Sequence, residues 1–465
     1  MTLRRKACRE SAVAAVPQFR PPHDGPVLEF ERRMLDAMPA IERWFRMQWQ
    51  DHVPPFYGSV DLRNAGFKLA PVDMNLFPGG WNNLSEEMLP CAVQAAQIAI
   101  DKLCPDARNL LLIPERHTRN QYYLSNVARL ARILRATGLE VRLGSLSDEV
   151  TAPTPIMLPD GESLLLEPLV RRHGRVGVDG FDPCAILLNN DLSAGIPAIL
   201  RDIEDQVVVP PLHAGWAVRR KSNHFYAYDG VAADFGALLG IDPWFVNPFF
   251  SRCGQVNFQE KSGEECLRAN VDAVLTEMRA KYREYGIADE PFVIVKADAG
   301  TYGMGIMTVK SPDDVTGLNR KQRNKMAVVK DGLQVHEVII QEGVPTYEWV
   351  DGGVAEPVVY MIDRYVVGGF YRAHRERGIN ENLNAPGMHF VPLARENTPF
   401  SGSCNLPDCK AAPGSSSSNR FYAYGVVARL AQLAAAVELE RTAGAVAAER
   451  FSEPVSAPAA LVAAG

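Results

Sequence analysis

The sequence lacks any apolar run long enough to cross a membrane, and the apolar stretch near its N-terminus is too short for a signal peptide. An excess of positive charge is also missing. The formal net charge is -6, which argues against general affinity for nucleic acid or membranes. Its 8 cysteines show neither C-x-x-C spacing nor a zinc-type histidine cluster. We therefore expect a cytoplasmic protein with reduced thiols and only local anion sites; an organelle transit peptide stays open.

What the chain does contain is a glycine-spaced loop between two β-branched runs, in the stretch 292–309, which reads FVIVKADAGTYGMGIMTV. Gly300, Gly303 and Gly305 permit a positive φ and let backbone N–H groups approach phosphate oxygens closely. Lys296 adds a positive charge at the end of the first run. This pattern predicts a loop that covers the phosphates of a nucleoside triphosphate; the alternative is a β-hairpin without a chemical role.

In this loop the lysine precedes the glycines, unlike in P-loop enzymes. The arrangement resembles the flap of the ATP-grasp superfamily. More narrowly, KADAGTYGMGIMTV resembles the proteobacterial glutamate–cysteine ligase family, from about Leu28 to about Glu440. The resemblance implies ATP-dependent joining of the γ-carboxylate of glutamate to cysteine through an acyl phosphate, the first step of glutathione synthesis. It also implies ATP and Mg²⁺ as cofactors and small-molecule substrates, and it leaves a homo-oligomer open.

Composition, with 465 residues of which 47% are hydrophobic, allows a large core and two or three domains. The alternation of strands and helices predicts a mixed α/β and α+β fold with an open parallel-sheet domain. The resemblance implies that the fold is ATP-grasp-like, circularly permuted, with that domain before the grasp. The expected parts are a disordered leader (1–27), an N-terminal helix and hairpin that join the ATP-grasp core (28–105), a pre-grasp α/β domain (106–215), the ATP-grasp domain (216–445) and a disordered tail (446–465).

Periodic apolar residues predict helices, and β-branched or apolar runs predict strands. Helices are expected over 28–48, 86–102, 121–136, 263–285 and 421–440. Strands are expected over 109–114, 139–146, 185–189, 206–211 and 334–340, in a hairpin over 60–75, and in two runs within 356–372. The segment between 146 and 185 reads as a loop-rich insert.

The resemblance assigns nucleotide-binding roles to particular residues. Lys221 and Lys296 take the places of the two phosphate-binding lysines, beside Gly300, Gly303 and Gly305 of the flap. The hinge that pairs with adenine through its backbone matches Gln341, Glu342 and Val344. Ribose is expected at an acid shortly after the hinge, with Glu348 or Asp351 as candidates.

Catalytic roles are implied for three residues: Arg372 as a clamp on the transferring phosphoryl group, with Lys296, and Asn382 in an Asn-rich loop that faces phosphate and acyl substrate. An arginine at a strand end is otherwise simply exposed. The substrate cleft is expected near 77–83 and around His224.

The metal ligands depart from the usual ATP-grasp order, because no acidic hairpin follows Arg372. The missing pattern lies near the N-terminus, where Asp61 and then Asp73-x-Asn75 stand on the two runs of a hairpin. Oxygen ligands on one strand face suit Mg²⁺. We therefore predict a permuted grasp in which this hairpin joins the strands 356–372. The alternative is a structural hairpin with exposed acids; the fallback ligands are Glu381, Asn382 and Asn384.

Two rival functions remain at this stage. One is another ATP-grasp carboxylate–amine ligase such as glutathione synthetase, because nucleotide motifs do not report the acceptor. The other is a nucleotide-binding regulatory protein without chemistry, against which Lys296 and Arg372 argue.

Overall fold

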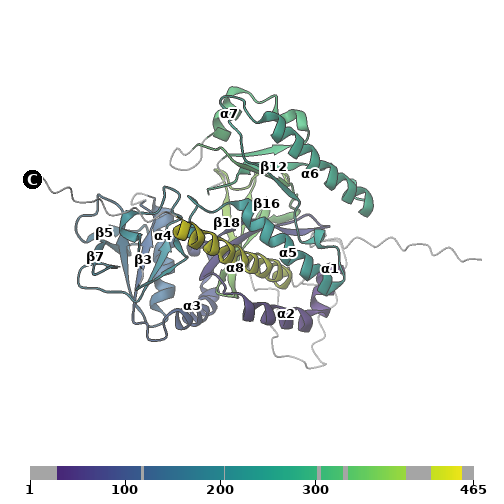
Figure 1. The fold of residues 1–465 in the computed structure, drawn as a ribbon. Coiled ribbons are helices and arrows are strands. Elements are labelled where there is room, and N and C mark those ends of the chain that lie inside the picture. Colours follow the sequence, from purple (N-terminus) through teal and green to yellow (C-terminus); the bar gives the residue numbers. More distant parts are fainter. Residues whose placement is uncertain are drawn as a thin grey trace, which may run out of the picture.

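The computed structural model describes residues 29–116, 120–203, 205–300, 305–327, 334–393 and 420–452. Its α-helices are α1 (Glu29–Asp36), α2 (Met38–Asp51), α3 (Leu89–Leu103), α4 (Gln121–Arg135), α5 (Lys221–Leu239), α6 (Glu264–Tyr285), α7 (Arg320–Ala327) and α8 (Arg420–Ser452). Three larger sheets and these helices form a molecule with three lobes around a central sheet (Figure 1). Among the described residues, no helix has the length and apolar composition to span a bilayer.

The central sheet is antiparallel and joins the two ends of the chain. Its order is β18 (His389–Pro392), β17 (Tyr365–His374), β16 (Gly353–Ile362), β1 (Tyr57–Asn64) and β2 (Leu69–Asn75), and β15 (Glu348–Val350) pairs with β16. The predicted hairpin is therefore present, with Gly66 at φ 77 in its turn, and β1 lies beside β16 in the register Asp61 to Val358.

A second sheet carries the α/β part of the chain. Its order is β10 (Val207–Val209), β9 (Ala185–Asn189), β3 (Asn109–Pro114), β4 (Glu140–Ser145), β6 (Ser163–Pro168) and β5 (Thr154–Met157). All neighbours except β5 and β6 are parallel. Strand β9 is buried throughout, and β3 is buried in all but its first residue, because the faces of a parallel sheet are covered by other elements. The division of the chain into domains at these bounds stays a prediction.

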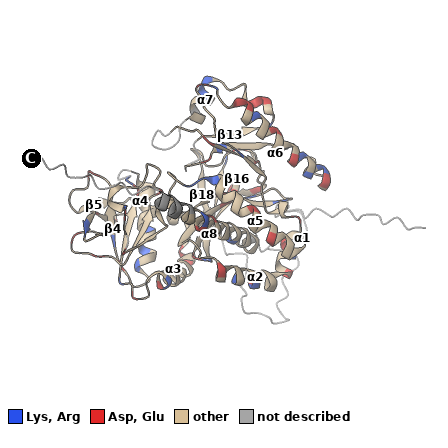
Figure 2. Cartoon of the chain, in the orientation of Figure 1, with Lys and Arg blue, Asp and Glu red and all other residues tan. Residues whose placement is uncertain are grey.

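The third sheet holds the predicted flap. Its order is β11 (Phe250–Cys253), β14 (Val338–Glu342), β12 (Val293–Ala297) and β13 (Ile306–Val309), all antiparallel. Helix α6 packs its apolar stripe, which includes Leu267 and Met278, against this sheet. Acidic and basic residues both lie along the outside of α6 (Figure 2).

Helix α8 is buried along most of its described length, since it packs on α5 and on strands β1, β2 and β16 of the central sheet. It is apolar on all sides there, as a helix enclosed by other elements must be. Some polar side chains of α8 make hydrogen bonds inside the protein. Gln432, for example, donates to the carbonyls of Pro55 and Asp363.

Three expectations need correction. The predicted helix 28–48 is two helices, because the chain breaks at Ala37 and α2 restarts with Pro39 in its first turn. The insert between β4 and β9 contains short strands besides β5 and β6, namely β7 (Val170–Arg172) and β8 (Arg175–Gly177). The predicted tail begins too early, since α8 continues to Ser452 through an alanine-rich segment that favours helix. The predicted leader and the Ser-rich loop lie outside the described residues.

Short 3-10 helices complete the structure. They are η1 (Trp81–Asn83), η2 (Glu86–Met88), η3 (Ala198–Leu200), η4 (Leu212–Ala214), η5 (Pro243–Phe245) and η6 (Pro312–Val315).

Candidate active site

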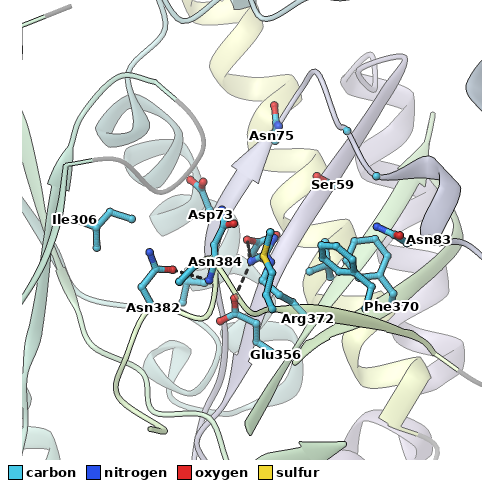
Figure 3. Close-up of a pocket in the computed structure, with 18 of the residues that line it drawn as sticks. Ser59, Asp73, Asn75, Asn83, Ile306, Glu356, Phe370, Arg372, Asn382 and Asn384 are labelled. Atoms are coloured by element: carbon cyan, nitrogen blue, oxygen red, sulfur yellow. Dashed lines mark hydrogen bonds and ion pairs between the residues drawn. The ribbon is translucent and has the colours of Figure 1, made fainter. Parts of the chain in front are cut away.

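A cavity of about 930 Å³ lies where the three sheets meet. The central sheet lines it with the polar face of β1, β2, β16 and β17, and the flap sheet contributes β12, β13 and the end of β14. The loop 77–83 and the ends of β3 and β9 line the opposite part. Figure 3 shows side chains from the central sheet, the flap sheet and the Asn-rich loop lying around one space, among them Asp73, Ile306 and Asn382. Most of the predicted site residues that the structure describes are therefore brought together.

Two carboxylates on the floor of the cavity face each other across the N-terminal hairpin. Asp61 on β1 is the register partner of Asp73 on β2, so both side chains share one face of the sheet. Like charges placed opposite each other repel unless cations lie between or beside them. Asp61 contacts the Arg372 guanidinium at 2.7 Å, and Asp73 contacts Lys221 Nζ at 2.6 Å.

Arg372 and Arg63 hold a third carboxylate, that of Glu356, between them. Arg372 Nη1 donates to Glu356 at 2.7 Å, and Arg63 Nε donates to the other oxygen of Glu356 at 2.8 Å. Arg63 also donates to the backbone carbonyls of Val344, Ile379 and Glu381. Arg63 therefore ties the central sheet to the hinge and to the Asn-rich loop. Glu356 is 3% exposed, so removing either arginine would leave a buried charge poorly compensated.

The pKa values reflect this crowding of buried charges. Burial raises the pKa of Asp73 in principle, but Lys221 and Lys296 outweigh it and hold that pKa well below its usual range. Burial lowers the pKa of Lys296 to about 8, although Asp73 works in the opposite direction. Burial raises the pKa of Asp61 despite its contact with Arg372, because Glu356 and Asp73 add to the effect. The cavity thus concentrates fixed charge in a poorly hydrated place.

The flap begins at Lys296, whose Nζ donates to Val72 O at 2.6 Å. Lys296 therefore reaches from the flap sheet to the strand that carries Asp73. Gly300 and Gly305 have φ values of 97 and 61, in the left-handed region that favours glycine. Gly303 lies outside the described residues.

The predicted hinge is at the end of β14. The carboxylate of Glu342 is bound by Lys68 at 2.7 Å, by the indole N–H of Trp244 and by the backbone N–H of Phe249. Its side chain is therefore committed to the protein interior. Part of the hinge backbone is paired as well, because the Glu342 N–H donates to Phe249 O at 2.7 Å and the Gly343 N–H donates to Phe292 O at 2.8 Å. Among the described residues, the Gln341 Nε2 atom is buried without a hydrogen-bond partner, and Gln341 and Val344 both line the cavity.

The acids proposed for ribose are not part of the cavity lining. Glu348 accepts hydrogen bonds from Asn64 at 2.7 Å and from Tyr424 at 2.5 Å, and its side chain is buried beside α8. Asp351 is exposed and pairs with Arg375. The structure therefore does not bring Glu348 or Asp351 to the other candidates.

The Asn-rich loop after β17 does reach the cavity. Asn382 and Asn384 line it, and the side chain of Asn382 accepts a hydrogen bond from the Asn384 backbone at 3.0 Å (Figure 3). Glu381 pairs with Arg377 at 2.9 Å and also accepts from the Gly378 backbone. Glu381 is thereby held at the cavity edge by its own loop.

The oxygen ligands present fit Mg²⁺ better than zinc. Across the residues that the structure describes, no group of three or more His, Cys, Asp or Glu side chains could hold a metal. Asp61, Asp73 and Asn75 offer two carboxylates and an amide on the cavity side of the hairpin. Mg²⁺ commonly takes one or two carboxylates and fills its remaining positions with water and substrate phosphates.

The far part of the cavity was only partly predicted. Phe77, Gly80 and Asn83 line it as expected, whereas His224 does not. His224 is buried against Glu438 of α8, at 3.3 Å, and burial lowers its pKa. Sequence reasoning missed Glu115 and Asn189, which line the cavity from the second sheet. The available signal was their position at the carboxyl ends of parallel strands, where ligands bind in open α/β sheets.

Comparisons with known proteins give the class and the family. The chain matches the glutamate–cysteine ligase family over residues 31–439. It is 62% identical to a protein of Methylobacillus flagellatus KT described as a candidate gamma-glutamylcysteine synthetase. That comparison has a TM-score of 0.80 and covers 92% of this chain and 99% of the other. A comparison with curated proteins gave no match.

Two further solved structures are only distantly similar. One is the D-alanyl-alanine synthetase A of Vibrio cholerae O1 biovar eltor str. N16961, with 10% identity and a TM-score of 0.33, covering 70% of this chain and 81% of the other. The other is a glutathione synthetase-like effector of Globodera pallida, with 9% identity and a TM-score of 0.34, covering 77% and 82%. These TM-scores are too low to support an argument about the fold.

The protein is an ATP-dependent ligase acting on small molecules. The chain belongs to the glutamate–cysteine ligase family.

Proposed function

We propose that this chain joins the γ-carboxylate of glutamate to the amine of cysteine within the cavity described above. The observation that carries the proposal is the convergence of Lys221, Lys296 and Arg372 on one space beside two carboxylates. A γ-carboxylate oxygen attacks the terminal phosphorus of ATP and releases ADP. The cysteine nitrogen then attacks the acyl carbon and releases phosphate, so no protein nucleophile is needed.

The protein's part in this chemistry is charge neutralisation and positioning. Lys296 and Lys221 would bind phosphate oxygens, and Arg372 would hold the phosphoryl group during transfer, with Asn382 beside it. The backbone of 341–344 would receive adenine. The flap glycines Gly300, Gly303 and Gly305 would let amide groups approach the phosphates.

For the metal we propose Asp61, Asp73 and Asn75 as ligands. Bound Mg²⁺ would supply positive charge to the phosphate oxygens of the nucleotide. The pairing of β1 with β16 supports a circularly permuted ATP-grasp, because the hairpin lies beside the strand pair that carries Arg372. A cytoplasmic location fits a reaction that consumes cysteine as a reduced thiol.

The test is ADP formation by the purified protein with ATP, Mg²⁺ and pairs of amino acids. Glutamate plus cysteine should stimulate ADP formation more than either alone, and γ-glutamylcysteine should appear as product. Faster turnover with γ-glutamylcysteine plus glycine would favour a glutathione synthetase. No stimulation by any acid and amine would favour a nucleotide-binding regulator.

A further inference from the structure

Two of the three candidate phosphate-binding cations, Lys221 and Arg372, are each paired with a candidate metal-binding carboxylate. Lys221 Nζ lies 2.6 Å from Asp73, and Arg372 Nη1 lies 2.7 Å from Asp61. The two cations are largely enclosed, with side chains 8% and 12% exposed. These contacts occupy the groups that a metal ion and a phosphate would each need.

Such pairs hinder either ligand when it binds without the other. A phosphate that binds Lys221 without a metal ion must compete with Asp73 for the ammonium group, and it meets the uncompensated charge of Asp73 nearby. A divalent cation that binds Asp73 without a phosphate must likewise displace Lys221. When both ligands bind together, two new ion pairs can replace each internal one: the carboxylate pairs with the metal ion, and the lysine or arginine pairs with the phosphate.

We propose that Asp73–Lys221 and Asp61–Arg372 are exchangeable ion pairs that couple metal binding to nucleotide binding. The proposal rests on the proposed function, since it assumes that nucleotide phosphates enter this cavity. Asp73 and Asp61 then have two roles. They bind the metal in the loaded site, and they hold the cations away from a metal-free nucleotide in the empty one. By linkage, each ligand strengthens binding of the other by the same factor.

The sign of one measurement separates this proposal from a simple metal site. If Asp73 only binds metal, Asp73→Asn should weaken binding in Mg²⁺ and leave metal-free binding unchanged. If Asp73 also restrains Lys221, the same substitution should strengthen the binding of metal-free ADP. Coupling between sites is commonly about 5- to 150-fold, so we expect a gain of about five-fold or more.

The experiment is isothermal titration calorimetry of ADP in EDTA and in Mg²⁺, for the wild-type protein and Asp73→Asn. The matched control is Glu376→Gln, which removes one negative charge from an exposed position outside the cavity lining. Its affinity for metal-free ADP should stay close to that of the wild type. In a Lys221→Met background, Asp73→Asn should give a much smaller gain, because the restrained group is gone.

If folded Asp73→Asn bound metal-free ADP with unchanged or weaker affinity, the proposal of exchangeable ion pairs would be overturned. An equal gain in Lys221→Met would also overturn it, because net charge alone would then be responsible. Should Asp73→Asn fail to fold by circular dichroism, Asp61→Asn should show a gain of the same sign. That gain should be smaller, since Glu356 still contacts Arg372. If the wild type bound no ADP even in Mg²⁺, the proposed function would fail instead.

Discussion

At the scale of single residues, Lys296 is the clearest candidate for a direct phosphate contact. It is 6% exposed, and burial lowers its pKa to about 8, so its ammonium group gains from any additional negative charge. We expect Lys296→Ala to weaken ADP binding about 10- to 100-fold, equivalent to the ~1.5–3 kcal/mol of a hydrogen bond to a charged group. Calorimetry in Mg²⁺ measures this directly.

Lys310→Ala is the matched control, because Lys310 follows the partner strand β13 but has a 58% exposed side chain. Its removal should change ADP affinity less than two-fold, since an exposed ion pair contributes only about 0–1 kcal/mol. Unchanged ADP affinity in Lys296→Ala would remove that residue from the nucleotide site.

The role of a residue could be predicted where a sequence motif places that residue near the end of a strand. Lys296 and Arg372 reach the cavity because strand alternation fixes their side-chain direction. Arg63 and Glu356 were missed because a buried ion pair leaves no mark in a local pattern when its partners are 293 positions apart. Glu348 failed for the same reason. Its partners Asn64 and Tyr424 come from distant parts of the chain.

At the scale of elements, the flap depends on backbone that few residues can adopt. Gly305 has φ 61, which costs a β-branched residue about 1–2 kcal/mol, and the Gly305 carbonyl accepts the Ala297 N–H at 3.2 Å. We expect Gly305→Val to lower turnover at least ten-fold, because a rigid, bulkier flap hinders approach to the phosphates. Initial rates of ADP formation and urea unfolding measure the two effects separately.

Gly254→Ala serves as the control, since Gly254 has open space around it and lies outside this cavity. It should leave both turnover and the urea midpoint close to the wild-type values. Full turnover in Gly305→Val would show that the flap backbone has no part in catalysis.

A buried ion pair fixes helix α8 to the segment just before α5, and through it to β2. Glu438 binds Arg219 through two contacts of 2.9 Å, and Arg219 also donates to Met74 O between Asp73 and Asn75. Burial disfavours the ionised form of Glu438 and by itself would raise its pKa. Arg219 and His224 outweigh this effect and lower the pKa from 4.5 to about 2. We expect Glu438→Gln to lower the free energy of unfolding at pH 7 by about 3–5 kcal/mol, because Arg219 loses its partner.

The pH dependence has a definite sign. A carboxyl group whose pKa is lower in the folded state stabilises the fold above pH 4.5 and loses this effect as pH falls toward 2. The difference between the wild type and Glu438→Gln should therefore shrink over that range in urea unfolding. Glu440→Gln, at an exposed position on the same helix, should show only a small difference at pH 7. If the difference in unfolding free energy between the wild type and Glu438→Gln stayed constant down to pH 3, the lowered pKa of Glu438 would be contradicted.

Elements with a strong period were predictable, and those governed by packing were not. The strand 185–189 and the helix 121–136 follow from their apolar patterns and agree with β9 and α4. The break between α1 and α2 was missed, although Pro39 is typical of a helix start. Within the described part of the chain, the extra strands β7 and β8 pair only with each other, and three-residue strands carry too little pattern to be recognised.

At the scale of the whole molecule, α8 covers one side of the main apolar core, which would otherwise be exposed to solvent. Its buried residues pack with α1, α5 and the central sheet in a single apolar cluster. We expect a chain that ends at residue 393 to show no cooperative thermal unfolding. Without α8, the apolar area exposed by this cluster would far exceed the exposed apolar area that a stable soluble domain tolerates. A chain that ends at Ser452 keeps all of α8 and should unfold at the wild-type temperature. Cooperative unfolding of the shorter chain would contradict this role.

The placement of β1 beside β16 also sets the order of events during synthesis. A ribosome adds roughly 5–20 residues each second, so the 293 positions that separate Arg63 from Glu356 take roughly 15–60 s to make. During that time the hairpin has been released, but the strand beside which it belongs does not yet exist. Its apolar face, with Val60 and Leu62, stays without its native cover. The nascent chain is therefore a strong candidate client for chaperones that hold emerging polypeptides.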